Sequence, residues 1–516
     1  GTSSFKFLNG MFAIAIYDNQ SNELIVARDR VGIKPVFYYY SNNKFLFASE
    51  AKSIYAYPEL ELTINYPVLN DYFTFGTIPS PFSIYREIRK LEPGKFIKFD
   101  GRFLSCGQYW DYSQVKPLNI SYSEAQETLK EKVTESVKKE MVSDVPVGCF
   151  LSGGVDSSIV AYEMNRISPD TRNYTVSFRG GNNKDEYYSK IFAEKLGLKH
   201  EVNILDFDYK AGFDKLINHL GEPFAIQSAI PLMMNSEISA TKNKVVLTGD
   251  GADELFGGYN RHRIFKSISG LLNLKLFSRN CPEKITELVN KSVLAPKVKK
   301  GFQYYIYPIL CSLSDKNIFD KYISFFAERD YSAHNIIFSD DIYDTFGQLQ
   351  YAKEFADVID DSKPDFNNIL KFDLRTTLID EMLMKVDTAT MINSQEARVP
   401  LINNDLIEFV CGLPFEYKVK DGVTKSLLKD AYSGIIPHEI LYAPKRGFNM
   451  PYDYWLKNIL YDEMYELLKQ NYSINIFKKT FIEKEFRNFK KGKSVVSAKT
   501  FLYLYFFLKW MSINGM

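Results

Sequence analysis

The chain has 516 residues, of which 45% are apolar, enough to build about three ordinary domains or two large ones. Its 64 basic and 63 acidic side chains leave a net charge of +1, which gives no reason to expect nucleic acid or an anionic membrane as a partner. The five cysteines show no C-x-x-C spacing, which predicts a reduced cytoplasmic protein without a zinc site. No apolar run reaches the length of a membrane span, and the richest, residues 501–508, is predicted to form a buried C-terminal helix.

The first hundred residues alternate apolar and polar positions in short runs. Four such runs, separated in part by turn-forming residues, lie at residues 11–18, 23–29, 35–40 and 44–50. Two more, at residues 96–99 and 102–104, meet at Asp100-Gly101, a dipeptide typical of tight hairpins. This pattern predicts a mainly antiparallel sheet.

Residues 145–165, VPVGCFLSGGVDSSIVAYEMN, predict a strand, a tight glycine loop and the start of a helix. Gly153 and Gly154 allow backbone amides to approach an anion, and the positive end of the helix favours negative charge there. Asp156 would repel such an anion unless a divalent cation lay between them, so we interpret it as a magnesium ligand. The loop lacks the lysine and spacing of a Walker A motif.

Strands and helices then alternate, with strands expected at residues 174–178, 201–205 and 244–248 and helices at residues 185–196, 209–220 and 231–240. This alternation predicts a parallel sheet covered by helices on both faces, with ligands at the carboxyl ends of its strands.

The last of these strands leads into TGDGADELFGGY, residues 248–259. Here Asp250, Asp253 and Glu254 crowd three carboxylates onto one loop, so a metal ion or another cation is expected among them. A solvated acidic turn is the alternative, and it loses weight if this loop lies beside the Ser152 loop on a neighbouring strand.

Residues 260–516 are mostly helical by period. Lys385, Asp387, Glu396 and Arg398 interrupt an apolar helical pattern, which indicates a cleft or a buried ion pair. For Glu396 and Arg398 a structural ion pair explains the pattern at least as well as catalysis does. Lys445 lies in the loop APKRGF, where its charge could meet a phosphate.

Several of these motifs resemble those of the glutamine-hydrolysing asparagine synthetases. The glycine loop is similar to the pyrophosphate loop (PP-loop) of the N-type ATP pyrophosphatases, and the order SGGVDSS, TGDGADELFGGY, SQEARVPL and APKRGF matches the synthetase family. The segments NGMFAIAIYD, ARDRVGIKPVFY, FASEAKSI and LEPGKF resemble the C-terminal half of a class II glutamine amidotransferase domain. The resemblance implies an α/β fold, with a parallel-sheet synthetase domain of the ATP-pyrophosphatase type and a large helical C-terminal part. A truncated, mainly antiparallel α+β domain of the N-terminal-nucleophile hydrolase type would precede it.

On this resemblance, residues 1–118 are expected to form the partial amidotransferase domain and residues 119–516 the asparagine synthetase domain. The latter would divide into an ATP pyrophosphatase core at about 119–265 and a helical remainder at 266–516. The family's glutaminase uses an N-terminal cysteine, but the sequence opens with Gly1 and no cysteine precedes Cys106. The chain as printed therefore has no glutaminase nucleophile. A fragment is the simplest interpretation, and a natural protein that has lost glutaminase activity is the alternative.

The resemblance also implies roles for individual residues and a reaction. The aspartate β-carboxylate would attack the α-phosphorus of ATP, pyrophosphate would leave, and ammonia, drawn from glutamine in a complete protein, would displace AMP from the aspartyl-adenylate. The implied cofactors are ATP and Mg²⁺, and the partners are small molecules, with a homodimer as a compatible assembly. The implied site residues are Asp250, Lys385 and Lys445 for catalysis, Asp156 and Asp253 for the metal, and Leu151, Ser152, Gly153, Gly154, Asp156, Ser157, Ser158, Val176, Thr248 and Gly249 for ATP and pyrophosphate.

Two departures from the family pattern bear on the reaction. Asp250 stands where the family often has glutamate, and Gln227 stands where asparagine synthetases carry an arginine suited to a carboxylate. Another acceptor, such as a uronic acid of a surface polysaccharide, therefore stays an alternative to aspartate. A catalytically idle paralogue is the other alternative, although the intact glycines, Asp156 and Lys445 argue against it.

Overall fold

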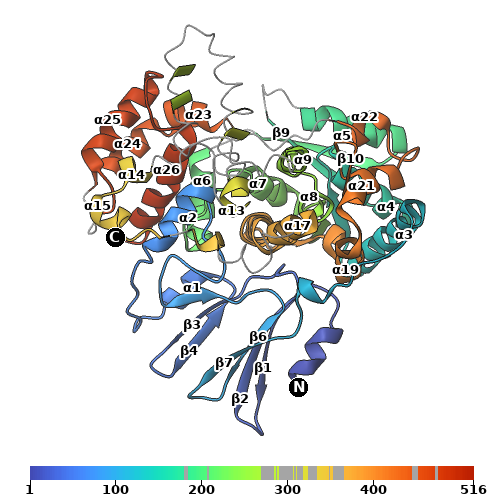
Figure 1. Ribbon diagram of the computed structural model, residues 1–516, viewed down its shortest axis with the longest axis horizontal. Coiled ribbons are helices and arrows are strands. Elements are labelled where there is room, and N and C mark those ends of the chain that lie inside the picture. Colours follow the sequence, from blue (N-terminus) through green and yellow to red (C-terminus); the bar gives the residue numbers. More distant parts are fainter. Residues whose placement is uncertain are drawn as a thin grey trace.

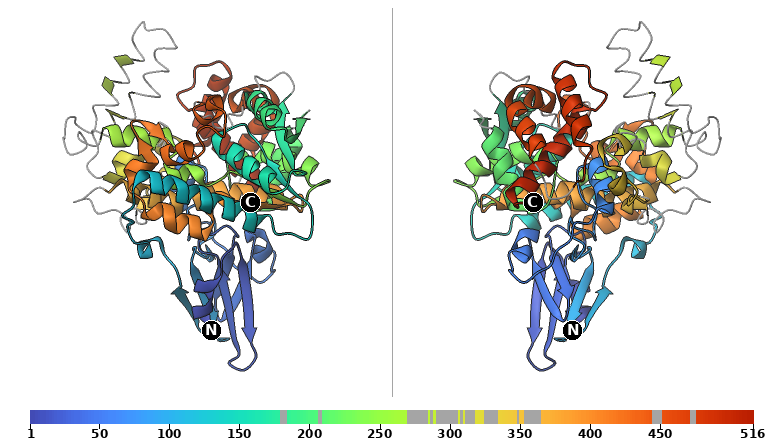
Figure 2. Two further views of the ribbon diagram at one scale, coloured as in Figure 1. Left: turned by 90° about the vertical axis from the view of Figure 1, so that its right-hand side faces the viewer. Right: turned by 90° about the vertical axis from the view of Figure 1, so that its left-hand side faces the viewer.

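The computed structural model describes residues 1–178, 184–205, 209–268, 284–285, 288–289, 306, 309–310, 318–323, 334–347, 349–352, 365–443, 451–470 and 475–516. Two antiparallel sheets form one end of the molecule, and helices surrounding a parallel sheet form the larger remainder (Figure 1). In the side views of Figure 2 the antiparallel sheets project from this larger part.

The N-terminal part consists of two small sheets that pack face to face. The four-stranded sheet has the order β1-β2-β6-β7 and the three-stranded sheet the order β4-β3-β5. Val26, Val36, Leu91 and Ile97 form a buried cluster between them. The antiparallel hairpins expected from the sequence are therefore confirmed, and β1 forms an edge of its sheet. The strands are β1 (Ala13–Asp18), β2 (Glu23–Arg28), β3 (Phe37–Ser41), β4 (Lys44–Ala48), β5 (Ile88–Lys90), β6 (Lys95–Phe99) and β7 (Leu104–Gln108).

The central part is a parallel sheet with the order β10-β9-β8-β11-β12. Its first crossovers follow the predicted alternation of strands and helices. The helix that precedes the sheet is capped by Ser121, whose side chain accepts a hydrogen bond from the Glu124 amide at 3.2 Å. The strands are β8 (Val147–Phe150), β9 (Arg172–Phe178), β10 (Lys199–Leu205), β11 (Val245–Leu247) and β12 (Glu396–Arg398). The helices are α3 (Tyr122–Glu140), α4 (Val155–Ile167), α5 (Lys184–Leu196), α6 (Tyr209–Leu220), α7 (Ala229–Ser239), α8 (Ala252–Phe256) and α9 (Asn260–Ser267).

One expectation about this sheet was wrong. Glu396 and Arg398 were assigned to a helical pattern, but they form β12, whose residues pair in parallel with β11. The preceding residues are helical as expected, first in a π-helix, η6 (Thr377–Leu383), and then in α18 (Met384–Met391). A three-residue strand carries too few positions to reveal its period, so its pairing partner determines its conformation.

The described part of residues 260–516 is otherwise mainly helical, as predicted. Among its helices are α17 (Phe366–Arg375), α19 (Asn404–Gly412), α21 (Ser426–Ala431), α24 (Tyr461–Lys469), α25 (Lys479–Lys490) and α26 (Ala498–Ile513). Further elements are α13 (Ile318–Ile323), α14 (His334–Ile337), α15 (Asp340–Tyr343), α20 (Phe415–Lys418), α22 (His438–Leu441), α23 (Tyr452–Tyr454), η8 (Trp455–Ile459) and the pair β13 (Val419–Lys420) and β14 (Val423–Thr424). None of the helices in the described part of the chain is long and apolar enough to cross a membrane.

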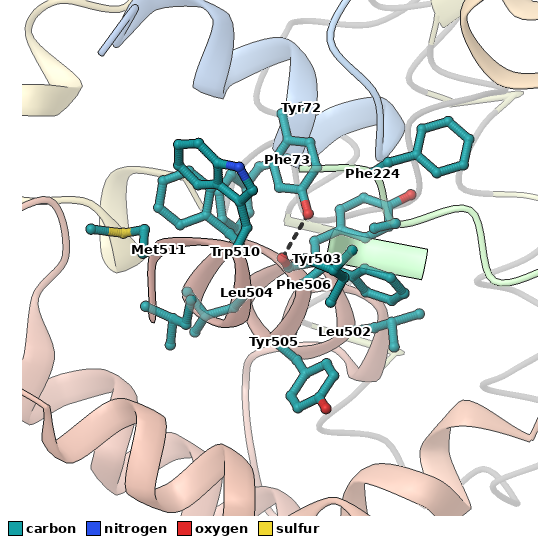
Figure 3. Close-up of a cluster of buried hydrophobic side chains, with 14 of the residues drawn as sticks. Tyr72, Phe73, Phe224, Leu502, Tyr503, Leu504, Tyr505, Phe506, Trp510 and Met511 are labelled. Carbon is teal, nitrogen blue, oxygen red and sulfur yellow. Dashed lines mark hydrogen bonds between the residues drawn. The ribbon is translucent and has the colours of Figure 1, made fainter. Parts of the chain in front are cut away.

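The predicted C-terminal helix, α26, is buried and packs against α2 (Pro67–Phe75) from the N-terminal part. Tyr72 of α2 packs against Tyr503 of α26, and the Tyr72 hydroxyl donates a hydrogen bond to the Tyr503 carbonyl at 2.9 Å (Figure 3). Phe73 packs against Phe507 of the same helix. One continuous apolar core contains these residues together with Trp510. The packing joins the N-terminal part to the helical part, while the domain boundaries at residues 118 and 265 stay predictions.

Candidate functional site

A cavity of about 1050 Å³ opens at the carboxyl edge of the parallel sheet. It is lined by the residues that follow β8, by Val176 in β9 and by the loop after β11, which is the edge where ligands of such sheets bind. Because β8 and β11 are hydrogen-bonded neighbours, their two loops lie side by side, as the sequence led us to expect. Leu151, Ser152, Gly153, Gly154, Asp156, Ser157, Val176, Thr248 and Gly249 all line the cavity, whereas Ser158 is fully buried.

The loop after β8 has a fixed shape. Ser152 and Ser157 share a hydrogen bond at 3.0 Å between their hydroxyls, and the Gly154 amide donates to the Ser152 hydroxyl at 3.3 Å. Gly153 has φ +72, and a Cβ there would lie 2.6 Å from the Ser189 amide nitrogen, so only glycine fits. The loop then enters the 13-residue helix α4, whose N-terminal end carries partial positive charge toward the cavity.

The loop after β11 touches this first loop through Gly249. A Cβ at Gly249 would lie 2.6 Å from the Ser157 amide nitrogen and 2.9 Å from Asp156. The Thr248 amide is in turn held by the Arg398 carbonyl of β12 at 2.9 Å. The two loops therefore form one contiguous wall, and the position of each depends on the other.

A lysine that sequence reasoning missed joins the acidic residues of these loops. The Lys425 ammonium lies 2.6 Å from Oδ2 of Asp156 and 2.6 Å from Oδ1 of Asp253, and its side chain is only 4% exposed. Burial opposes the charge, but the two carboxylates outweigh it and raise the pKa of Lys425 well above its ordinary value. A metal ion or another cation was expected among Asp250, Asp253 and Glu254, and at Asp253 a lysine of the chain itself takes that position.

The second ion pair of the cavity joins Lys385 of α18 to Asp250 at 3.0 Å. Burial disfavours the Lys385 charge, yet Asp250 and Glu381 hold the pKa of Lys385 above its ordinary value. Glu381 belongs to η6 and lines the same cavity, and burial raises the pKa of its carboxyl. π-Helical turns often occur at functional sites. Sequence reasoning found Lys385 and Asp250 but missed Glu381.

Arg261 of α9, also missed, provides a cationic wall on another side of the cavity. Its guanidinium lies 3.8 Å from the ring centroid of Tyr259 and donates to Asp373 at 3.0 Å and to the Tyr322 hydroxyl at 3.2 Å. These contacts fix the orientation of the guanidinium. Its only local signal is its position just after TGDGADELFGGY.

Four residues singled out in the sequence have other outcomes. Lys445 lies outside the described residues. Glu396 and Arg398 bind one another at 2.6 Å, and Arg398 also donates to the carbonyls of Glu140 and Val142, so their pairing is structural. Gln227 does line the cavity, with its side-chain oxygen buried.

The described side chains around the cavity offer only part of the ligand shell of a hard divalent cation such as Mg²⁺. Among the residues that the structure describes, no group of three or more His, Cys, Asp or Glu side chains is arranged to hold a metal ion. Asp156 and Asp253 do converge on one point, marked by Lys425. Since Mg²⁺ in nucleotide sites commonly takes one or two carboxylates and completes its shell with phosphates and water, this pair fits such an ion once phosphates are present.

Comparison with known proteins assigns a class to this combination of fold and cavity. Residues 128–512 match the asparagine synthase family, and residues 1–110 match a glutamine amidotransferase domain. The chain therefore belongs to the asparagine synthase family, a class of ATP-using carbon–nitrogen ligases with glutamine as amido donor.

Individual relatives are moderately similar. The chain is 29% identical over 517 residues to the glutamine-hydrolyzing asparagine synthetase 1 of Bacillus subtilis, covering 98% of this chain and 78% of that protein. It is 28% identical over 484 residues to a putative glutamine-hydrolyzing asparagine synthetase of Mycobacterium tuberculosis, covering 89% and 69%. It is also 25% identical over 526 residues to the amidase chry2 of Gibberella zeae, covering 91% and 73%.

Proposed function

We propose that this chain converts a carboxylate to an amide by adenylating it with ATP, releasing pyrophosphate, and letting ammonia displace AMP. The observation that carries the proposal is the contiguous wall of two loops, one glycine-rich and one acidic, at the carboxyl edge of the parallel sheet. Such a wall offers backbone amides and a helix N-terminus to phosphates next to carboxylates that suit a divalent ion.

In this proposal the loop residues 152–158 bind the pyrophosphate portion of ATP. Leu151, just after β8, and Val176, within β9, line the cavity and would contact the adenosine, and Thr248 and Gly249 would line the nucleotide. Asp156 and Asp253 would hold Mg²⁺ together with the phosphates, and such an ion would supply charge neutralisation there. Lys445 would place a positive charge near the departing pyrophosphate.

The Asp250–Lys385 pair would act where the acceptor meets the α-phosphorus. Lys385 keeps its positive charge there and can stabilise the negative charge that develops on the acyl-phosphate oxygens. Glu381, whose carboxyl has a raised pKa, would accept the proton that ammonia loses as the carbon–nitrogen bond forms and AMP leaves.

Aspartate is the first acceptor to test, in keeping with the names of the synthetase relatives. In keeping with the same names, glutamine would supply the amide nitrogen in the complete protein. Gln227 favours a second candidate, a different carboxylate, because an uncharged amide takes the place of a bidentate arginine. The relatives themselves differ in name, since one of comparable coverage is an amidase. Arg261 would then be the carboxylate anchor of the acceptor, since its guanidinium lines the same cavity.

The proposal is tested by measuring pyrophosphate release and AMP formation from ATP and ammonium across a panel of carboxylic acids that includes aspartate and uronic acids. Release that requires aspartate supports asparagine synthesis, and release that requires another acid supports the second candidate. No release with any acid, from protein shown to be folded and to bind ATP, would instead support an idle paralogue. Arg261→Gln should raise the KM for the acceptor while leaving that for ATP unchanged if Arg261 is the anchor.

A further inference from the structure

Lys425 occupies the position in which the two acidic loops of the cavity would present a divalent cation. Its ammonium is equidistant, at 2.6 Å, from one oxygen of Asp156 and one of Asp253. These are the two carboxylates that the sequence and the donor chemistry assign to magnesium. The Lys425 ammonium and a divalent metal ion, both positively charged, would therefore compete for the same pair of oxygens.

The position of Lys425 is set by its surroundings. Its backbone has φ 54 and ψ 33, a left-handed conformation that a lysine keeps only where neighbouring contacts impose it. Gly258 gives the side chain its room, because a Cβ there would lie 2.1 Å from Cε of Lys425 and 1.9 Å from Oδ1 of Asp253. The bridge is thus a built feature of the fold.

The charges of this group predict how a divalent ion enters. The bridge itself, two carboxylates and one ammonium, carries one net negative charge where Lys425 is almost fully buried, and the positive charge of Lys429 also acts on both carboxylates. A divalent ion added alone would leave one net positive charge and face the ammonium across shared oxygens, which is unfavourable in a poorly solvated site. A triphosphate brings several negative charges and offers the ammonium new partners.

We propose that Lys425 is the resident counter-ion of the Asp156–Asp253 pair, and that it makes divalent-cation binding depend on the nucleotide, because the phosphates draw its ammonium off the carboxylates. The inference rests on the proposed binding of a nucleoside triphosphate at this edge. Lys425 then acts as a positioning residue twice, first by holding the two loops together and then by transferring its charge to the phosphates. Metal and nucleotide binding are coupled through this single side chain.

The decisive experiment titrates the chain with Mn²⁺ alone and detects free ion by electron paramagnetic resonance. Lys425→Met keeps an unbranched side chain and removes the charge, so it should bind Mn²⁺ at least about tenfold more tightly than wild type, within the range of ordinary couplings between sites. The double variant Lys425→Met with Asp253→Asn should lose this tight binding. Lys429→Met is the matched control for general charge, since the Lys429 ammonium interacts electrostatically with Asp156 and Asp253 but lies over the Tyr442 ring at 5.5 Å instead of bridging the pair.

Equal Mn²⁺ affinity in wild type and Lys425→Met would overturn the proposal. So would a gain of equal size in Lys429→Met, because it would reflect the general charge of the cavity. Circular dichroism and thermal unfolding establish that each variant is folded before it is titrated.

A second measurement needs only the wild-type chain. Its Tm is recorded with Mg²⁺, with a non-hydrolysable α,β-methylene analogue of ATP, and with both. The proposal predicts that the joint shift in Tm exceeds the sum of the separate shifts, and strictly additive shifts would contradict it. Neither experiment involves turnover, so an absence of pyrophosphate release alongside intact coupling would refute the proposed reaction and leave the role of Lys425 standing.

Discussion

Gly249→Ala tests the contact between the loops that follow β8 and β11. The new Cβ would lie 2.6 Å from the Ser157 amide nitrogen and 2.9 Å from both the carbonyl carbon and Cβ of Asp156. An ordinary contact at such a position begins near 3.4 Å, so the loops must separate by about 0.8 Å. The atoms in the way belong mostly to the backbone, so no side-chain rotation can relieve the clash.

The expected result has two parts. Overpacking of this kind costs about 1–3 kcal/mol of unfolding free energy, so the variant should fold with a lowered Tm. A misplacement of about 1 Å at a reacting centre can cost about 10²-fold in rate, so turnover should fall by that order while the chain stays folded.

The assay is ammonium-dependent pyrophosphate release, read together with thermal unfolding. Gly347→Ala is the control, because a Cβ at Gly347 meets no atom within 4 Å and Gly347 does not line the cavity. It should behave as wild type in both measurements. A Gly249→Ala variant with turnover within twofold of wild type would refute the idea that the loops form one rigid wall.

Four further predictions concern charge and nitrogen. Asp156→Asn should abolish most pyrophosphate release, and, because Lys425 then keeps only Asp253 as an anionic partner in the bridge, it should also lower the Tm; near-native turnover at saturating Mg²⁺ would contradict the assignment. Lys445→Ala should reduce kcat more than it weakens ATP binding, and steady-state kinetics showing an effect on apparent ATP affinity alone would make it a ground-state contact. Burial raises the pKa of Asp71 from 3.8 to about 7, so between these pH values the folded state holds a proton that the unfolded state has lost. As the pH rises from 4 to 7, the free energy of unfolding of wild type, measured with urea, should therefore fall by up to about 4 kcal/mol relative to that of Asp71→Asn. Burial raises the pKa of the three cysteine thiols that the structure describes, which disfavours the thiolate that a glutaminase nucleophile needs. The 516-residue chain should therefore use ammonium but not glutamine, and glutamate release from glutamine by the pure chain would refute this.

The sequence predicted most of the fold because its periodic segments are long. The hairpins of the first hundred residues and the strands β8 to β11 carry clear local patterns, and their turns are marked by glycine, asparagine and aspartate. β12 escaped because three residues show no period and pairing with β11 sets its conformation. The packing of α2 on α26 also has no local signal, since it depends on complementary apolar faces far apart in the chain.

The site was predictable to a similar extent and for the same reason. The loop after β8 and the loop after β11 are each recognisable in the sequence, because each combines glycines and aspartates within a dozen residues. Lys425 lies 269 residues from Asp156, and only the fold brings them together. The crowding of carboxylates indicated that a cation was needed, but not which residue would supply it.

The packing of α2 against α26 has a consequence for how the protein is made. Tyr72 and Tyr503 are 431 residues apart, so at ordinary translation rates roughly 20–90 s separate the synthesis of the two sides of their shared core. During that interval the apolar face of α2, with Tyr72 and Phe73, emerges from the ribosome without the surface that later buries it. The N-terminal sheets can pair early, yet their attachment to the rest of the molecule must wait. A nascent chain of this protein should therefore depend on chaperones that shield aromatic surface for most of its synthesis.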